Sequence, residues 1–379
     1  MKILVTSHTG IGGIARTSKQ IREQILSNHK SDEIVIINEN RENKREYTKR
    51  YRNTSVYSFP TPEGLHAFKS YTKFKKHYKP AIDKMADIIR SEKPDIILII
   101  GTFYFPWFLL NAAKETKSPF IIRYGGIIEM EETKKIWLRM GKDFVNPKYD
   151  YVFPSNHSKK TVESIHNIQL PHSWVIHNGL PDEFFDVKDS KLKSKKFKIG
   201  YVGRHYGVKN PEFCLKLAKL LKDRPEYTIE MVSTYKVKCH KKGRVASKTV
   251  NKFLDAGIKL TSPMNINRLA KFYKDQDVII SPSHFETYGY VPLEAMATGT
   301  PALINKTLGV KEVFKKLGLD DYIMDFKNPD SIIKKIDFIR ENRVVIDGEA
   351  SRRLRKEYSF SKTMAQFFNT FEKVLRRRA

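Results

Sequence analysis

The sequence predicts an α/β protein of two doubly wound domains with a cleft between them. Apolar runs of strand length alternate with amphipathic segments of helix length along most of the chain, which is typical of parallel sheets wound with crossover helices. The length of 379 residues exceeds what one hydrophobic core normally supports, so we expect two domains. In such folds, ligands bind at the carboxyl ends of the strands.

The strand candidates fall into two groups, one in each half of the chain. Those of the first half are residues 3–6, 33–38, 56–59, 95–100, 120–123, 151–154 and 174–177. Those of the second half are residues 198–202, 228–233, 258–261, 278–281, 302–305 and 322–325. The polar, lysine-rich residues 186–196 between the groups have the composition of a linker. We therefore predict an N-terminal domain of residues 1–190 and a C-terminal domain of residues 191–358.

The chain is strongly basic, with a formal net charge of +28. Lysine and arginine crowd into residues 41–52, 69–77 and 376–378. Three interpretations remain open: attraction to an anionic membrane surface, binding of nucleic acid, or a lysine-rich composition with solvated charged faces. No recognised nucleic-acid-binding module accompanies the interleaved aromatic and basic residues 47–51, so nucleic acid is not an expected partner.

The remaining composition favours a cytoplasmic protein. Cys214 and Cys239 are too few for a disulfide scaffold, so reduced thiols are expected. Residues 2–6 begin an apolar strand pattern, and no secretory signal precedes them. The apolar residues 103–113 are shorter than the roughly 18 residues that a membrane span needs. Peripheral attachment to a membrane, through basic and aromatic segments such as residues 134–139, is a separate expectation.

The most informative segment is residues 281–301. A strand is followed by a loop that contains Gly289, and a short helix with Pro292 in its first turn ends before Gly299. Unpaired amides at a helix start, beside a permissive glycine, suit a diphosphate or a sugar hydroxyl. Glu286 and Glu294, eight positions apart, bracket this anion site. One carboxylate can accept hydrogen bonds from a sugar, and the other from a ribose diol.

This segment resembles the glutamate, seven residues, glutamate motif of glycosyltransferase family 4, the retaining GT-B enzymes of the glycosyl transferases group 1. The resemblance implies two Rossmann-like domains that face a central cleft. It also implies that Glu286 contacts the donor sugar and that Glu294 binds the nucleotide ribose. The loop amides that hold sugar and phosphate would be those of Thr287, Tyr288, Gly289, Tyr290 and Val291.

A second match lies at the start of the C-terminal domain, where residues 199–210 resemble the family's strand, Gly-Arg, loop and lysine element. The resemblance implies that Gly203 lies at the donor and that Arg204 and Lys209 bind its diphosphate, so that Arg204, Lys209 and Glu286 form the catalytic set. Two cations at a strand end neutralise a diphosphate and stabilise the charge on the leaving nucleotide. We therefore expect neither a metal nor another cofactor.

Further matches extend the resemblance into the N-terminal half. Residues 8–15 are similar to the family's glycine-rich turn, which would bring Gly12 and Gly13 to the donor phosphates or the acceptor. Residues 177–185 resemble its Asn-Gly segment before the linker. The resemblance also implies that residues 359–379, with an amphipathic helix at 361–375, cross back onto the N-terminal domain and bury apolar side chains there, namely Met364, Phe367, Phe368 and Phe371.

One position departs from the family pattern. Many members carry a histidine near the reacting sugar, after the strand that corresponds to residues 119–126. This chain has Arg123 and Tyr124 there. We expect one of these two side chains to contact the donor sugar, its phosphate or the acceptor instead.

Two motifs support other chemistry. Residues 10–15, with Glu39 after the next strand, fit a loose dinucleotide-binding fingerprint, which would suit an NAD-dependent oxidoreductase. That interpretation leaves residues 281–301 unexplained. Asp275 and Asp277 form an Asp-x-Asp pair of the kind that binds manganese in the other large glycosyltransferase fold. A junction between a helix and a strand explains them without a metal.

The resulting hypothesis is retaining transfer of a sugar from a nucleotide-diphosphate-sugar donor to a hydroxyl of a glycan, lipid-linked or similar acceptor. The acceptor hydroxyl would attack from the face that the nucleotide leaves, and no enzyme nucleophile is needed. A nucleotide-sugar epimerase of the same fold is the alternative. Release of nucleoside diphosphate without an acceptor separates slow hydrolysis by a transferase from epimerisation.

Overall fold

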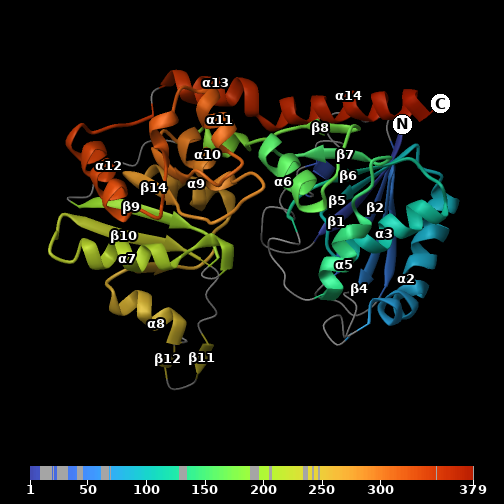
Figure 1. Ribbon diagram of the computed structural model, residues 1–379, viewed down its shortest axis with the longest axis horizontal. Coiled ribbons are helices and arrows are strands. Elements are labelled where there is room, and N and C mark those ends of the chain that lie inside the picture. Colours follow the sequence, from blue (N-terminus) through green and yellow to red (C-terminus); the bar gives the residue numbers. More distant parts are fainter. Residues whose placement is uncertain are drawn as a thin grey trace. The chain divides into compact units, whose positions relative to one another are not determined.

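The computed structural model describes residues 1–8, 19, 21–23, 33–40, 46–60, 68, 70–127, 135–187, 196–204, 207–233, 238–240, 243–245, 248–346 and 348–378. They form two compact units (Figure 1). The N-terminal unit comprises Met1–Asn178 and Phe360–Ala379, and the C-terminal unit comprises Gly179–Ser359. The chain leaves the first unit after Asn178, whereas the lysine-rich composition placed the boundary at residue 190.

The N-terminal unit contains an eight-stranded sheet in the order β3-β4-β2-β1-β5-β6-β7-β8. All neighbours are parallel except β3 and β4, which are antiparallel. The strands are β1 (Lys2–His8), β2 (Glu33–Asn40), β3 (Tyr47–Tyr51), β4 (Thr54–Pro60), β5 (Ile96–Ile100), β6 (Phe120–Arg123), β7 (Asp150–Phe153) and β8 (Ser173–Val175). Central strands such as β5 are apolar throughout because both faces of the sheet are covered.

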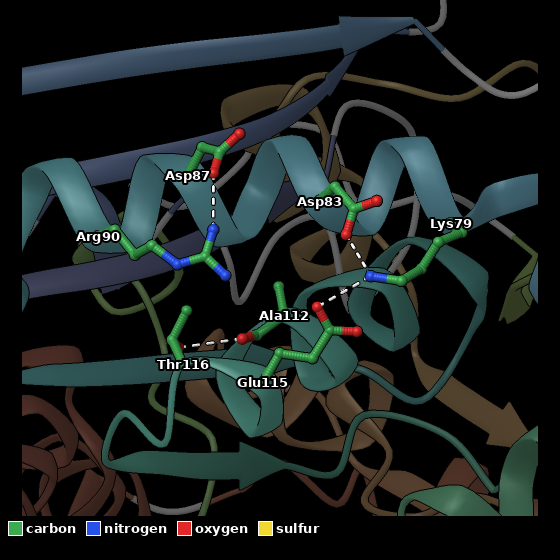
Figure 2. A network of polar contacts seen from close by, with 7 residues as sticks. All are labelled: Lys79, Asp83, Asp87, Arg90, Ala112, Glu115 and Thr116. Carbon is green, nitrogen blue, oxygen red and sulfur yellow. Dashed lines mark hydrogen bonds and ion pairs between the residues drawn. The ribbon is translucent and has the colours of Figure 1, made fainter.

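Helices cover the faces of this sheet (Figure 1). They are α2 (Tyr71–Glu92), α3 (Tyr104–Glu115), α5 (Lys135–Asp143), α6 (Asn156–His166) and α14 (Phe360–Arg378). Helix α2 begins at Ser70, whose hydroxyl accepts a hydrogen bond from the Lys73 amide, and it ends at Lys93 in a left-handed conformation. Helices α2 and α3 pack side by side, and an ion pair of 3.1 Å between Lys79 and Glu115 joins them (Figure 2).

The C-terminal helix α14 packs within the N-terminal unit, although nearly two hundred residues separate it from that part of the chain. Its apolar stripe lies against side chains of one sheet face, including Ile3, Leu98 and Val152. The stripe consists of Met364, Phe367, Phe368, Phe371 and Val374, all of them buried. The four apolar residues expected to be buried on this helix are therefore buried.

The C-terminal unit contains a six-stranded parallel sheet in the order β13-β10-β9-β14-β15-β16. Its strands are β9 (Phe197–Val202), β10 (Tyr227–Val232), β13 (Lys259–Thr261), β14 (Val278–Ser281), β15 (Ala302–Asn305) and β16 (Ile323–Met324). Its helices are α7 (Glu212–Leu220), α8 (Lys248–Asp255), α9 (Ile266–Lys274), α10 (Tyr290–Ala297), α11 (Lys311–Lys316), α12 (Pro329–Glu341) and α13 (Gly348–Tyr358). One core lies on each face of the sheet.

Each predicted strand overlaps an observed strand, and three observed strands were not predicted. Strand β3 lies in the segment interpreted as a basic cluster, and its residues 48–51 are all exposed. The short strands β11 (Lys238–His240) and β12 (Gly243–Val245) form a separate antiparallel pair. Edge strands and isolated hairpins bury little, so they lack the apolar runs by which strands are recognised.

Two further expectations concern membranes and thiols. Over the described part of the chain, no helix combines the length and the apolar character needed to cross a bilayer. Trp137, in a segment expected to touch a membrane, is 4% exposed and packs in the N-terminal unit, where its ring centre lies 6.1 Å from that of Phe74.

The Cys214 thiol is free and buried, and burial raises its pKa.

Candidate functional site

The first part of the site is the loop that follows β9. The β9 residue Tyr201 organises this loop, because its hydroxyl lies 2.8 Å from the Arg204 carbonyl oxygen and 3.3 Å from that of Lys209. Gly203 passes so close to this ring that a Cβ atom there would lie 2.8 Å from the Tyr201 hydroxyl oxygen. The residue must therefore be a glycine, or the tyrosine must move. Arg204 and Lys209 thus lie on one folded loop at the carboxyl end of a central strand.

The second part is the loop between β14 and α10, which carries Glu286. Gly289 caps α10 with a φ of 105°, a conformation that favours glycine. The third residue of the helix is Pro292, which has no N–H, so the backbone donors of the first turn are those of residues 289–291. The carbonyls of Glu286 and Tyr288 accept hydrogen bonds from the amides of residues 309 and 310 at 3.0 and 2.7 Å. These bonds set the path of the loop.

Three contacts join the two loops. The His284 amide donates to the Val208 carbonyl at 2.7 Å, and the Asn210 side-chain amide donates to the Pro282 carbonyl at 3.1 Å. The Lys209 Nζ lies 2.5 Å from the Glu286 Oε1 atom. The side chains of Lys209 and Glu286 are 25% and 16% exposed, so water screens their attraction less than that of an exposed pair. The fold therefore places a cation and a carboxylate, 77 residues apart in sequence, at one point.

The second glutamate of the motif occupies a different environment. Glu294 lies in α10 and is 1% exposed. Its Oε2 atom accepts a hydrogen bond of 2.7 Å from the hydroxyl of Tyr273, a fully buried residue of α9. The motif thus provides one carboxylate that is partly open to solvent and one that a tyrosine holds in the interior.

The other residues predicted to bind the sugar donor offer the proposed site mainly backbone groups. The Tyr288 side chain is 2% exposed and belongs to the core, and Tyr290 and Val291 pack against that core. Thr287 lies between Glu286 and Tyr288 and is partly buried. Gly12 and Gly13 lie outside the described residues. An anion site here would therefore use loop amides rather than these side chains.

Arg123 and Tyr124 lie in the core of the N-terminal unit. Arg123 is 2% exposed, donates a hydrogen bond to the Asn178 side-chain oxygen, and lies 5.7 Å from the centre of the Phe367 ring of α14. Tyr124 is 3% exposed and stacks on Phe153, with 4.9 Å between the ring centres. The contact of either residue with a sugar stays a prediction.

The Asp-x-Asp pair lies at the opposite end of β14 from Glu286. Asp277 precedes the strand, its carboxylate accepts a hydrogen bond of 2.6 Å from the Lys198 amide, and its own amide donates to the Lys198 carbonyl. Asp275 caps α9. Among the described residues, no group of three His, Cys, Asp or Glu side chains is placed to hold a metal ion. The two aspartates thus have a structural explanation at the junction of a helix and a strand.

Glu39, the acid of the dinucleotide fingerprint, lies at the end of β2. It is 1% exposed and accepts a hydrogen bond from the Tyr104 hydroxyl. The glycines of that fingerprint lie outside the described residues.

Three residues that organise the site were not identified from the sequence: Tyr201, Tyr273 and Ser283. Ser283 lies three positions before Glu286, a spacing at which a hydroxyl often bonds within its own loop. That spacing is a usable but weak signal. No sequence signal identifies Tyr201 or Tyr273. The Tyr201 hydroxyl bonds to backbone carbonyls of a loop, and the Tyr273 hydroxyl bonds to Glu294, which lies in another helix.

Comparison with known proteins finds a family match for the C-terminal half and a common fold for the chain. Residues 182–358 match the family model "Glycosyl transferases group 1". An uncharacterized glycosyltransferase from Methanocaldococcus jannaschii is 27% identical over 234 residues, which are 56% of this chain and 57% of that protein. A D-inositol 3-phosphate glycosyltransferase from an Arthrobacter species is 29% identical over 116 residues, 30% of this chain and 28% of that protein. The matches thus span about half, or less, of these relatives.

Solved structures match nearly the whole chain. Sucrose-phosphate synthase from Thermosynechococcus elongatus superposes with a TM-score of 0.75 over 99% of each chain, at 12% identity. HepE from Anabaena, in complex with UDP and glucose, superposes with a TM-score of 0.72 over 98% of this chain and 99% of its own, at 15% identity. At such identities the likeness shows a common fold.

Proposed function

We propose that the protein is a retaining glycosyltransferase, because residues 182–358 match the glycosyl transferases group 1 and the chain has the GT-B fold. It transfers a sugar from a nucleotide-diphosphate-sugar donor to a hydroxyl acceptor. The fold expectation and the family resemblance of the C-terminal half are both confirmed. The activity, the donor, the acceptor and the stereochemistry are the proposal.

The observation that carries the proposal is the contact between Lys209 and Glu286. It joins two loops at the carboxyl ends of neighbouring strands β9 and β14, where doubly wound sheets bind ligands. A cation suits a diphosphate, and a carboxylate suits sugar hydroxyls. The donor amides of the first turn of α10 lie directly after Glu286 in the chain. One place therefore offers complementary groups for the diphosphate and the sugar of a nucleotide sugar.

Proteins of the same fold support this donor class. HepE from Anabaena has been crystallised with UDP-glucose, and a trehalose-6-phosphate protein from E. coli with UDP-2-fluoro glucose. A structure of trehalose-6-phosphate synthase is described in terms of glycosyl transfer with retention. These descriptions make a nucleotide sugar the first donor to test and retention the first stereochemistry to test.

In the proposed reaction, the acceptor hydroxyl attacks the anomeric carbon on the face from which the diphosphate departs. Its proton passes to a departing phosphate oxygen, and the bond between sugar and phosphate breaks. Lys209 and Arg204 stabilise the negative charge that develops on the diphosphate, and Glu286 orients the sugar and stabilises its positive charge. These two cations supply the charge that a metal ion would otherwise provide, so the proposal includes no metal. The acceptor is a glycan or a lipid-linked hydroxyl.

A panel of nucleotide sugars tests the proposal. The donor should raise the unfolding temperature, because a ligand present at 100 times its Kd stabilises the folded state by about 2.7 kcal/mol. Incubation of that donor with candidate acceptors should release nucleoside diphosphate. The new glycosidic linkage, observed by NMR, should have the same anomeric configuration, α or β, as the sugar in the donor. Turnover should persist in EDTA. Stabilisation by no nucleotide sugar would contradict the proposal, and isomerisation of the donor sugar would favour the epimerase.

Substitution of Glu286 provides the residue-level control. Glu286→Ala should lower kcat by about 100-fold or more, because a preorganised charge that acts in the transition state is lost. Donor binding should largely survive, because the contacts with the nucleoside diphosphate remain and only the contact with the sugar is lost. Glu212 forms a comparable ion pair of 2.7 Å with Lys252 on the surface of the same unit. Glu212→Ala should leave kcat unchanged. Unchanged turnover in the Glu286 variant would refute its assignment.

A further inference from the structure

The Glu286 carboxylate has a second, partly buried contact. The Ser283 hydroxyl lies 3.0 Å from Glu286 Oε1, the same oxygen atom that Lys209 contacts at 2.5 Å. Within the described part of the chain, these two contacts of the carboxylate both fall on Oε1. A hydroxyl and an ammonium on one oxygen set the rotation of the carboxylate and leave Oε2 for other partners.

Ser283 is itself firmly placed. It is 3% exposed, and its carbonyl accepts hydrogen bonds from the Asn305 side-chain amide at 3.0 Å and from the Thr307 hydroxyl at 3.2 Å. Asn305 is the last residue of β15 and is 7% exposed. The backbone at Ser283, from which the hydroxyl projects, is thus tied to the sheet rather than to the loop alone.

Donor binding would change the two contacts differently. The diphosphate of a nucleotide sugar is a competing anion for the Lys209 ammonium, whereas the Ser283 side chain is 3% exposed and little of it is open to a ligand. When Lys209 turns to the phosphate, the bond from Ser283 remains on Oε1. Ser283 then determines how Glu286 faces the sugar during transfer.

We propose that Ser283 is a positioning residue for the reaction, which fixes Glu286 so that Oε2 faces the donor sugar. This inference rests on the proposed glycosyl transfer. It predicts an effect on the recognition of the sugar and on kcat, and no effect on binding of the nucleoside diphosphate, which Glu286 does not hold. A purely structural role would instead lower stability and all ligand affinities together.

The test uses Ser283→Ala in the full chain. The kcat should fall about 10-fold, the size of one hydrogen bond to a charged group. The ratio of Kd for UDP to Kd for UDP-glucose should also fall, with the Kd for UDP unchanged. If the panel selects another nucleotide sugar, that sugar and its diphosphate replace this pair. Ser351→Ala is the matched control, because the Ser351 hydroxyl is partly buried in the same unit and bonds to the Ala297 carbonyl at 3.3 Å.

A double-mutant cycle separates positioning from folding. In the Glu286→Ala background, Ser283→Ala should produce no further change in kcat or in the ratio of Kd values, because the residue to be positioned is gone. An equal loss in both backgrounds, an unchanged kcat in Ser283→Ala, or a weaker affinity for UDP would overturn the inference. Failure of the proposed function is distinct: the wild-type protein would then bind no nucleotide sugar.

Discussion

At the scale of single residues, two carboxylates of one motif differ in their surroundings. Glu286 is partly open and pairs with a lysine, whereas Glu294 is buried against a tyrosine. Their chemical types and spacing are visible in the sequence. Their surroundings are not, because Lys209 and Tyr273 come from other elements.

The Tyr273 hydroxyl should orient Glu294 toward the ribose of the donor. Tyr273→Phe removes one buried hydroxyl and keeps the ring, so the Kd for UDP should rise about 5- to 10-fold, as expected for one lost hydrogen bond to a charged group. The Kd for 2′-deoxy-UDP should rise less, because that ligand lacks one of the ribose hydroxyls. Calorimetric titration of both nucleotides measures the difference.

Tyr227→Phe is the matched control for this substitution. The Tyr227 hydroxyl also donates a hydrogen bond to a partly buried carboxylate of the same unit, that of Asp337 in α12, away from the two loops of the site. Tyr227→Phe should lower the free energy of unfolding and leave the Kd for UDP and the Kd for 2′-deoxy-UDP unchanged. Equal weakening of UDP and 2′-deoxy-UDP by Tyr273→Phe would argue against a role in ribose recognition.

At the scale of elements, α12 is attached to the start of β10 by a charged cluster. Arg224 donates two hydrogen bonds to Asp337, at 2.7 and 3.0 Å, and the Tyr227 hydroxyl donates a further one. Burial alone would raise the pKa of Asp337, but the hydrogen bonds from Arg224 and Tyr227 outweigh it and lower that pKa. Burial and the bond to Asp337 raise the pKa of Tyr227 to about 12.

This cluster should make stability depend on pH. A carboxyl with a lowered pKa in the folded state stabilises the protein above its unfolded pKa of about 3.9, and the contribution is lost as pH falls through the lower folded value. Asp337→Asn should therefore cost about 1 kcal/mol of unfolding free energy near pH 7, after allowance for solvent screening, and progressively less as the pH falls below about 3.9. Urea unfolding at several pH values measures this. A difference that stays constant with pH would contradict the assignment.

Basic residues on different elements form separate ion pairs rather than one continuous positive surface. Arg377 and Arg378 of the tail contact the fully buried carboxylate of Asp150 at the start of β7. On α2, Lys79 pairs with Asp83 and Glu115, and Arg90 pairs with Asp87 (Figure 2). These four cations are thus paired within the fold, whereas the net charge of +28 remains. Attachment to an anionic membrane stays a prediction, and exposed cations of β3 and α2 are the residues through which it would act.

At the scale of the whole molecule, the C-terminal helix α14 belongs to the same compact unit as the N-terminal residues 1–178. Removal of residues 360–379 would expose the sheet face that Phe367 and Phe371 cover. Each lost apolar side chain is worth about 1.5–3 kcal/mol, so the five buried side chains of the stripe together approach the stability of a domain. The shortened chain should lose the cooperative unfolding of its N-terminal unit.

The C-terminal unit should respond differently to this truncation. It has cores of its own on both sheet faces, so it should keep a transition that nucleotide sugar shifts upward in differential scanning calorimetry. A chain shortened only by residues 376–379 keeps the apolar stripe and loses the contacts to Asp150. Its N-terminal unit should be destabilised by about 2 kcal/mol, the range of hydrogen bonds to charged groups. An unchanged first transition in the longer truncation would contradict this description.

The sequence by itself determined the alternation of strands and helices, the two-domain organisation and the two loops that carry the proposed donor site. Apolar runs such as those of β5 and β14 and the glycine at position 289 are local signals, because burial on both faces and a positive φ restrict the residue type at each position. Edge strand β3 was not predicted, because exposure to solvent does not restrict the residue types of a strand to apolar ones.

Only the tertiary structure decided which groups meet. The pairing of Lys209 with Glu286, the bond from Tyr273 to Glu294 and the contact of Arg377 with Asp150 join residues 77, 21 and 227 positions apart. Each of these contacts depends on the register of strands and the packing of helices. A charged side chain is compatible with many partners, and its position in space selects one of them.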